Sequence, residues 1–305
     1  MPKHAFCILA HTDPYCLNTL LRLIDHPDNH VFIHIDRKAK RISFNGLRTR
    51  FSPVRVIPEN ESVKVSWGGL SGVEAELIVF EHALRSGIQF SYLHLLSGQD
   101  LPLKNPEEMH RFFKAAPQGT NFIDFSTDKD NLRNLRSKTI RYVPFANHLR
   151  PASPLARILY GCLRHGGLLV QKALGIRRNW NGIKLYKGAN WVSVTPDFAR
   201  YLIGHKYLIL RRFKGVSCAD EIYKQTLFMA SPYKDTLHLP ADNGLTAGTR
   251  LIDWEHPDTP GSPHTWRTGD FETLTESGAI FARKFSSDTD REIIDRISEW
   301  ITNRK

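Results

Sequence analysis

The chain has 305 residues, of which 41% are hydrophobic and 24% charged, a composition that fits a globular protein of one large or two small domains. Its net charge of +11 favours an anionic partner: a nucleic acid, an acidic membrane surface or a small molecule that carries phosphate. No apolar run approaches the roughly 18 residues that a membrane-spanning helix needs, and MPKHAFCILAH lacks the features of a signal peptide.

Strand-like and helix-like segments alternate over residues 1–125. Short apolar runs predict the strands, and apolar residues at helical spacing predict the helices. The predicted strands are Ala5–Ala10, Val31–Asp36, Val54–Ile57, Tyr92–Leu96 and Phe122–Phe125, and the predicted helices are Pro14–Asp25, Ser71–Leu84 and Pro106–Phe113. This alternation predicts an α/β fold with a mostly parallel central sheet flanked by helices.

Residues 126–187 form a basic insert between the two regular halves of the chain. Within it, Leu155–Ile176 has apolar runs broken by basic residues. Two interpretations stay open for this segment. It is either an interfacial amphipathic helix that touches anionic lipid, or a core helix with a solvated basic face.

Regular elements return after the insert. We predict strands at Asn190–Val194, Thr236–Leu239 and Arg250–Ile252, and helices at Asp197–Ile203, Asp220–Ala230 and Asp288–Asn303. The last helix is amphipathic, because its isoleucines follow a spacing of three to four residues. We expect a single domain with a nucleotide-binding half (1–125), the insert (126–187) and a half that carries the acceptor and the catalytic group (188–305).

Polar residues follow three of the predicted strands. His11 follows the first, Asp36 ends the second and Asp100 follows the fourth. Ligands of open α/β sheets bind beyond the carboxyl ends of the strands, so these side chains are candidates for contacts to a nucleotide. A turn or helix-capping role remains the alternative for each of them.

The segment GVSCADEIYKQTLF places two carboxylates, Asp220 and Glu221, at the start of a predicted helix. One interpretation is an N-cap with a first-turn carboxylate. The other is a general base, since transfer of a group to a hydroxyl requires removal of a proton whose pKa lies far above 7.

A cluster of cations near the C-terminus could stabilise a departing diphosphate. FARKF holds Arg283 and Lys284 between two phenylalanines, and Arg267 and Arg250 lie upstream. Cations in apolar surroundings attract an anion more strongly than they do in water. A basic pair on the surface is the alternative.

We expect no bound metal. Two Asp-x-Asp sequences occur, Asp128–Lys129–Asp130 and Asp288–Thr289–Asp290, but a lysine separates the first pair and the second opens a predicted helix as a cap. None of the four cysteines lies in a C-x-x-C pair, which disfavours zinc. We expect free thiols in a cytoplasmic protein, either freely soluble or peripheral at the inner face of the membrane.

Six blocks of the sequence, in order, resemble the core-2/I-branching β-1,6-N-acetylglucosaminyltransferase family, which includes peptide O-xylosyltransferases. The resemblance covers nearly the whole chain. Its blocks are AHTDPYCLNTLLRLIDHPDNHVFIHIDRK, VSWGGLSGVEAELIVFEHAL, YLHLLSGQDLPLK, GANWVSVTPDF, CADEIYKQTLF and SGAIFARKFSSD. The chain differs from eukaryotic members in lacking an anchor, a stem and disulfides, so it resembles a minimal bacterial member.

The resemblance implies a GT-A-like fold, no metal and no other cofactor. It implies Glu221 as the general base and Lys284 as a contact to the donor diphosphate, together with Arg267 or Arg250 and the neighbouring Arg283. The implied nucleotide contacts are His11 and Asp36. The implied acceptor contacts are Trp191, Asp100, Lys104 and Asp220.

The resulting hypothesis is an inverting transfer of a sugar, N-acetylglucosamine in the first instance, from a UDP-sugar to a hydroxyl of a glycan or lipid-linked glycan. Transfer from UDP-xylose or UDP-glucose by the same fold is the alternative. The non-enzyme alternative is a basic protein that binds membranes peripherally or binds nucleic acid; no nucleic-acid-binding module is present.

Overall fold

The central sheet has five strands in the order β3-β2-β1-β4-β6. The computed structural model describes residues 2–39, 44, 46–151, 153–239, 247–259 and 261–304. The strands are β1 (His4–Ala10), β2 (Asn29–Ile35), β3 (Val54–Val56), β4 (Tyr92–Ser97) and β6 (Ser193–Val194). All neighbours run parallel except β6, which is antiparallel to β4. The predicted α/β fold with a mostly parallel sheet flanked by helices is therefore confirmed.

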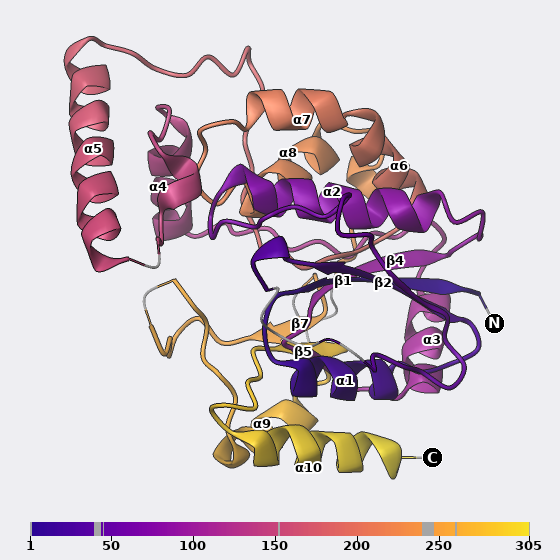
Figure 1. The fold of residues 1–305 in the computed structure, drawn as a ribbon. Coiled ribbons are helices and arrows are strands. Elements are labelled where there is room, and N and C mark those ends of the chain that lie inside the picture. Colours follow the sequence, from indigo (N-terminus) through magenta and orange to yellow (C-terminus); the bar gives the residue numbers. More distant parts are fainter. Residues whose placement is uncertain are drawn as a thin grey trace.

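Helices cover both faces of this sheet (Figure 1). One layer contains α1 (Pro14–Leu23), α9 (Phe271–Glu276) and α10 (Arg291–Thr302); the other contains α2 (Leu70–Leu84), α6 (Pro196–Gly204), α7 (Lys206–Arg212) and α8 (Tyr223–Met229). Alternate side chains of β1 enter the two cores, Phe6 and Ile8 on one side and Ala5 and Cys7 on the other. This period of two explains why the strand is apolar throughout.

Side-chain caps and prolines begin several helices. Asp13, Asn105 and Thr195 cap α1, α3 (Pro106–Ala115) and α6, each of which has a proline in its first turn. Asp290 caps α10 by accepting the N–H of Ile293 at 3.0 Å, which confirms the capping interpretation of that residue. Short 3-10 turns occur at Arg37–Ala39, Ala146–His148, Ala219–Glu221, Lys234–Thr236 and Thr268–Asp270.

A second sheet of three strands lies beside the first, in the order β5-β8-β7. Its strands are β5 (Asp100–Pro102), β8 (Phe281–Arg283) and β7 (Arg250–Ile252), of which the sequence predicted only β7. In the antiparallel pair β5–β8, Asp100 lies opposite Arg283. The FARKF block is thereby joined to the segment that follows β4.

Three predicted strands are wrong or too long. Phe122 makes only an isolated bridge to Ser193, and Leu237 only an isolated bridge to Asn121. Of Asn190–Val194, only Ser193 and Val194 pair with β4 as a strand. Phe122, Ile123 and Val192 are buried without a continuous partner strand, because the antiparallel edge of the sheet is two residues long there, and Leu239 is exposed.

The basic insert contains α4 (Lys129–Thr139) and α5 (Pro154–Ala173), and α5 stands at the edge of the molecule beside α4 (Figure 1). No residue of α5 is buried, so the core-helix interpretation is wrong. Among the described residues, no helix combines the length and the apolar character required to cross a bilayer.

Candidate active site

The carboxyl ends of β1 and β2 define one side of the site. The strand order reverses between β1 and β4, and open α/β sheets bind ligands at such a reversal. His11 follows β1, and Asp36 follows β2. Oδ1 of the buried Asp36 accepts the N–H groups of Lys38 at 2.9 Å and of Val65 at 3.1 Å, which fixes the carboxylate at the strand end.

The terminal FARKF block reaches these strand ends. Burial and the nearby Arg283 lower the pKa of His11, Asp36 opposes them, and Lys284 adds to the lowering. The N–H of Asp36 donates to the carbonyl of Ala10 at 2.9 Å, so the end of β2 lies beside the end of β1 that leads to His11. His11 is thus within electrostatic range of Asp36, Arg283 and Lys284.

Arg283 is held from two sides. Its Nη1 donates to Oδ1 of Asp100 at 2.7 Å, and its guanidinium carbon lies 4.5 Å from the centroid of the Trp191 ring. Asp100 is buried; burial raises its pKa, while Arg283 opposes that shift. Asp100, predicted to contact an acceptor, therefore anchors Arg283, and Arg283 in turn holds Trp191.

Of the two upstream arginines, Arg267 lies beside Lys284. The N–H of Trp266 donates to the carbonyl of Lys284 at 2.9 Å, and Arg267 is 46% exposed and pairs with Asp258 at 3.0 Å. Burial and Arg283 lower the pKa of Lys284, against the attraction of the same Asp258. Arg267 and Lys284 thus share one acidic neighbour.

Arg250 has a different environment. It is buried, and its Nη2 donates to the carbonyl of Val192 at 2.8 Å and to Oγ of Ser193 at 3.0 Å. Burial lowers its pKa to about 10. Arg250 therefore supports Val192 and Ser193, which directly follow Trp191.

Glu221 lies in a cluster of charges at the other side of the site. Its Oε2 is 2.9 Å from Nζ of Lys138 and 3.6 Å from Nζ of Lys187. Its backbone carbonyl accepts the N–H of Gly188 at 3.0 Å. Burial lowers the pKa of Lys138, but Glu221 and Cys218 attract its charge, and the net shift is upward.

Asp220 is not the helix cap that one interpretation assigned to it. The helix α8 begins at Tyr223 without a side-chain cap, and Asp220 lies in the preceding 3-10 turn. Its Oδ1 is buried and has no hydrogen-bond partner among the described residues. Burial and the adjacent carboxylates of Glu221 and Glu76 raise the pKa of Asp220 to about 7.

A buried ion pair lies behind these two carboxylates. Lys224 pairs with Glu76 of α2, and the exposed fraction of each side chain is at most 1%. Lys224 also donates to Oδ1 of Asn190, and Tyr223 donates to Glu76 at 2.8 Å. The pair thereby ties α8 to α2 and to Asn190, the residue that precedes Trp191.

The segment 188–193 joins the two sides of the site. Gly188 contacts Glu221, Asn190 contacts Lys224, and Trp191 contacts Arg283. A Cβ on Gly188 would lie 1.7 Å from the carbonyl oxygen of Asp124, so only glycine fits there. The base candidate and the cation cluster are thus a few residues apart along one segment.

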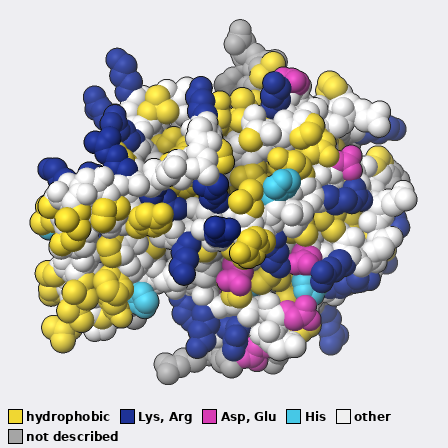
Figure 2. All heavy atoms as spheres, turned by 90° about the horizontal axis from the view of Figure 1, so that it is seen from above, with side chains coloured by type: hydrophobic (Ala, Val, Ile, Leu, Met, Phe, Trp, Pro, Cys, Tyr) yellow, Lys and Arg dark blue, Asp and Glu magenta, His cyan; other side chains and the backbone are white. Residues whose placement is uncertain are grey.

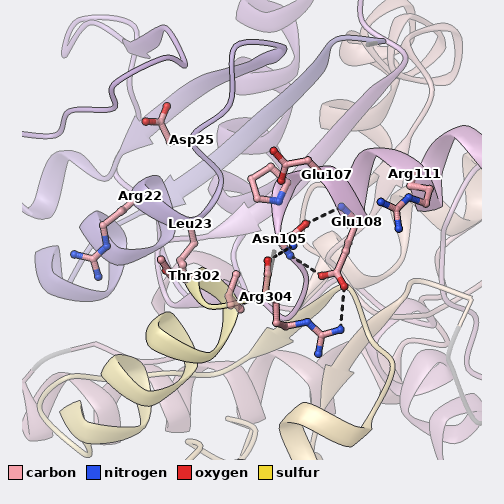
Figure 3. A pocket seen from close by; sticks show the side chains of 11 residues that line it. Arg22, Leu23, Asp25, Asn105, Glu107, Glu108, Arg111, Thr302 and Arg304 are labelled. Carbon is pink, nitrogen blue, oxygen red and sulfur yellow. Dashed lines mark hydrogen bonds and ion pairs between the residues drawn. The ribbon is translucent and has the colours of Figure 1, made fainter.

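Lys104, a predicted acceptor contact, lies elsewhere. It follows the far end of β5 and lines a shallow pocket with Glu108, Arg111 and Gly278. A neighbouring pocket of about 630 Å³ lies between α1, α3 and the end of α10 (Figure 3). Asn105, Glu108 and Arg304 form hydrogen bonds at its wall, and none of the predicted site residues lines it.

The Asp-x-Asp residues have structural partners. Asp128 caps α4 by accepting the N–H of Asn131 at 2.8 Å, and Asp130 pairs with Arg133 on the exposed side of the same helix. In the described ranges, no three His, Cys, Asp or Glu side chains are grouped as a metal site would require.

Four charged residues of the site escaped prediction, and the sequence carries signals for them. Glu76 interrupts the apolar stripe of its helix, three residues after Val73, and Lys224 lies between Tyr223 and Phe228 in an apolar helix. A charge on a buried stripe requires a partner. Lys138 and Lys187 lie in a segment without acidic residues, so their partner had to come from elsewhere in the chain.

Residues 4–276 match the family model of the Core-2/I-branching enzyme, a match that ends before the FARKF block. The chain is 24% identical to β-glucuronosyltransferase GlcAT14A of Arabidopsis thaliana over 99% of this chain and 65% of that protein. It is also 24% identical to human N-acetyllactosaminide β-1,6-N-acetylglucosaminyl-transferase, over 93% of this chain and 68% of that protein.

A third relative is mouse xylosyltransferase 1, which is 22% identical over 98% of this chain and 30% of that protein. The chain therefore spans about 65% or less of the length of several curated relatives that it matches. Since the family model covers most of the 305 residues, this chain belongs to the Core-2/I-branching enzyme family.

Proposed function

We propose that the protein is an inverting glycosyltransferase that moves a sugar from a UDP-sugar to a hydroxyl of a glycan without a metal ion. The observation that carries the proposal is the segment 188–193, which contacts the backbone carbonyl of Glu221 at one end and Arg283 of the cation cluster near the other. Acid–base catalysis and charge stabilisation are the two functions that such a transfer requires.

Glu221 is the general base in this proposal. Both lysines contact its Oε2, so in this proposal Oε1 is the oxygen that takes the proton of the acceptor hydroxyl. The acceptor oxygen then forms the bond to the anomeric carbon. The bond from that carbon to the diphosphate oxygen breaks, and UDP leaves with the electron pair from the opposite face, which inverts the configuration.

Lys284 and Arg267 stabilise the negative charge that develops on the diphosphate. Both lie beside Asp258, and Arg283 is fixed next to them by Asp100. Fixed cations in a partly buried site can take the place of a divalent ion at a leaving diphosphate. His11 and Asp36 receive the nucleotide at the strand ends.

N-acetylglucosamine is the sugar that we propose. The names of relatives include N-acetylglucosaminyl, glucuronosyl and xylosyl transfer, so UDP-xylose and UDP-glucose remain the competing donors to be compared. Trp191 offers its ring to an acceptor sugar. We propose a lipid-linked glycan as acceptor and a cytoplasmic location at the inner face of a membrane.

Thermal-shift measurements with UDP and UDP-sugars, each with and without EDTA, test the proposal. A ligand that binds only the folded protein raises the Tm by mass action. We expect UDP-N-acetylglucosamine to raise the Tm and to be hydrolysed slowly, with no loss in EDTA. No response to any nucleotide would end the proposal, and a strict Mn²⁺ requirement would overturn its metal-free part.

A further inference from the structure

The helix α5 (Pro154–Ala173) turns its apolar side chains outward. Its half-buried residues include Tyr160, Gly167 and Gln171, which face the protein. Six of its large hydrophobic side chains are 45–79% exposed, with Leu155 the most exposed: Leu155, Ile158, Leu159, Leu163, Leu169 and Val170. At 3.6 residues per turn these six fall on one side of the helix and form one stripe, the outer stripe.

The inner face of α5 is attached by contacts other than a hydrophobic core. Gln171 accepts the N–H of Tyr142 at 3.0 Å and donates to its carbonyl at 2.8 Å. The ring of Tyr160 stacks on His148 at 4.4 Å, and Gly167 lies against Pro144, where a Cβ would come within 2.8 Å of that ring. These contacts fix the orientation of α5, so the outer stripe faces away from the protein.

The charge of the molecule is concentrated around this helix. Residues 131–196 contain twelve Lys or Arg and no Asp or Glu, whereas the rest of the chain has 30 basic and 31 acidic residues. The segment that contains α5 thus carries a net charge of +12, and the rest of the chain a net charge of −1. Figure 2 shows hydrophobic side chains gathered at the left, the side on which α5 lies in Figure 1, with Lys and Arg beside them.

An exposed apolar stripe within a segment without carboxylates fits one class of partner. A second copy of the chain would bring like charges together at the stripe, and a nucleic acid would leave the leucines in water. An anionic bilayer can bind both the apolar stripe and the cations. The apolar face of the helix inserts at the boundary of the acyl chains, and the cations pair with the anionic headgroups. We infer that α5 lies in the interfacial plane of an anionic lipid bilayer.

The position of α5 in the chain links this surface to the site. Lys138 lies near the end of α4, before α5, and Lys187 lies after α5. Both contact Glu221, so the chain on each side of α5 carries a lysine that binds the same carboxylate. This step rests on the proposed function. A bilayer at α5 would present a lipid-linked acceptor to the side of the site that holds the base.

Vesicle co-sedimentation tests the inference. The probes are vesicles of phosphatidylcholine alone and of phosphatidylcholine with phosphatidylglycerol in equal parts. The stripe variant carries Leu155→Ser, Ile158→Ser and Leu169→Ser. The matched control removes three equally exposed apolar side chains elsewhere, through Tyr207→Ser, Leu239→Ser and Trp254→Ser. The charge variant carries Arg157→Ser and Lys172→Ser.

We expect the wild-type protein and the matched control to bind the anionic vesicles, and the stripe variant to bind at least tenfold more weakly. Each cation near an anionic surface contributes roughly fivefold in binding, so the charge variant should lose roughly 25-fold. Hydrolysis of UDP-sugar in solution should not change in any variant. That last readout separates the two proposals, because failure of the proposed function would abolish it in the wild-type protein as well.

Three outcomes would overturn the inference. In the first, the wild-type protein does not bind anionic vesicles, or the stripe variant binds them as the wild type does. In the second, light scattering finds a wild-type dimer that the stripe variant loses, which would assign the stripe to a second copy. In the third, duplex DNA binds in place of vesicles and the stripe substitutions leave that binding unchanged.

Discussion

The two sides of the site are built differently. The cation side is assembled at strand ends, where His11 and Asp36 meet a block from the far end of the chain and Arg267 remains 46% exposed. The carboxylate side rests on buried charges, since Glu76 and Lys224 are almost completely shielded from water. The partly exposed cations suit a large anionic ligand that must bind and dissociate. The buried ion pair suits a carboxylate whose position must stay fixed.

This contrast indicates which substitutions will affect catalysis and which will affect folding. Arg267 and Lys284 on the cation side carry charge without complete burial, so their loss should weaken donor binding and turnover more than stability. Side chains behind the carboxylates are partners of buried charges, so their loss should first affect the free energy of unfolding.

The largest expected effect follows from Glu221→Gln. The amide keeps the shape of the side chain but cannot accept the proton, so turnover should fall by roughly 10²–10⁴-fold. The Tm and the affinity for UDP should stay close to those of the wild type, as should all three quantities in the exposed control Glu255→Gln. Full turnover in Glu221→Gln would move the base to another group.

Breaking the buried pair should cost the most stability. Glu76→Leu and Lys224→Met each leave a buried charge without its partner, which typically lowers the free energy of unfolding by about 3–5 kcal/mol. The double variant Glu76→Leu/Lys224→Met should recover much of that loss. Urea unfolding of the four proteins gives the coupling energy, and purely additive losses would show that the two residues do not act as a pair.

Lys284→Ala should reduce turnover by roughly 10²–10³-fold, comparable to the loss of one preorganised donor at a developing negative charge. Affinity for UDP should fall with it, and Lys284→Arg should restore part of both. The control is Lys114→Ala, on the exposed surface of α3. Equal affinity for UDP in Lys284→Ala and the wild type would remove Lys284 from the diphosphate site.

The smallest effect concerns the pH dependence of stability through Asp220. Its pKa is raised from the ordinary value of 3.8 to about 7 in the folded protein, so the folded state binds the proton more tightly than the unfolded state does. That stabilisation is complete below pH 3.8 and is lost as the pH rises through 7. Asp220→Asn should therefore gain Tm relative to the wild type between pH 5 and pH 8. A constant difference in Tm across that range would contradict the raised pKa.

The sequence by itself determined the periodic elements. The runs that became β1, β2 and β4 are short and mostly apolar, and those that became α2 and α10 have apolar residues every three to four positions, so burial of those residues leaves few alternatives. Motif order also indicated the family, and placed Glu221 and Lys284 in blocks that the structure joins through residues 188–193.

Only the tertiary structure decided where the isolated charges go. The strands β5 and β8 are three residues long, too short for a periodic signal, yet their pairing sets Asp100 against Arg283. The pairing of Glu76 with Lys224 joins residues 148 positions apart. The outward stripe of α5 has the same helical period as a core-facing one, so periodicity could not distinguish them. Which face of an amphipathic helix is covered depends on the neighbouring elements, and that information is absent from the local sequence.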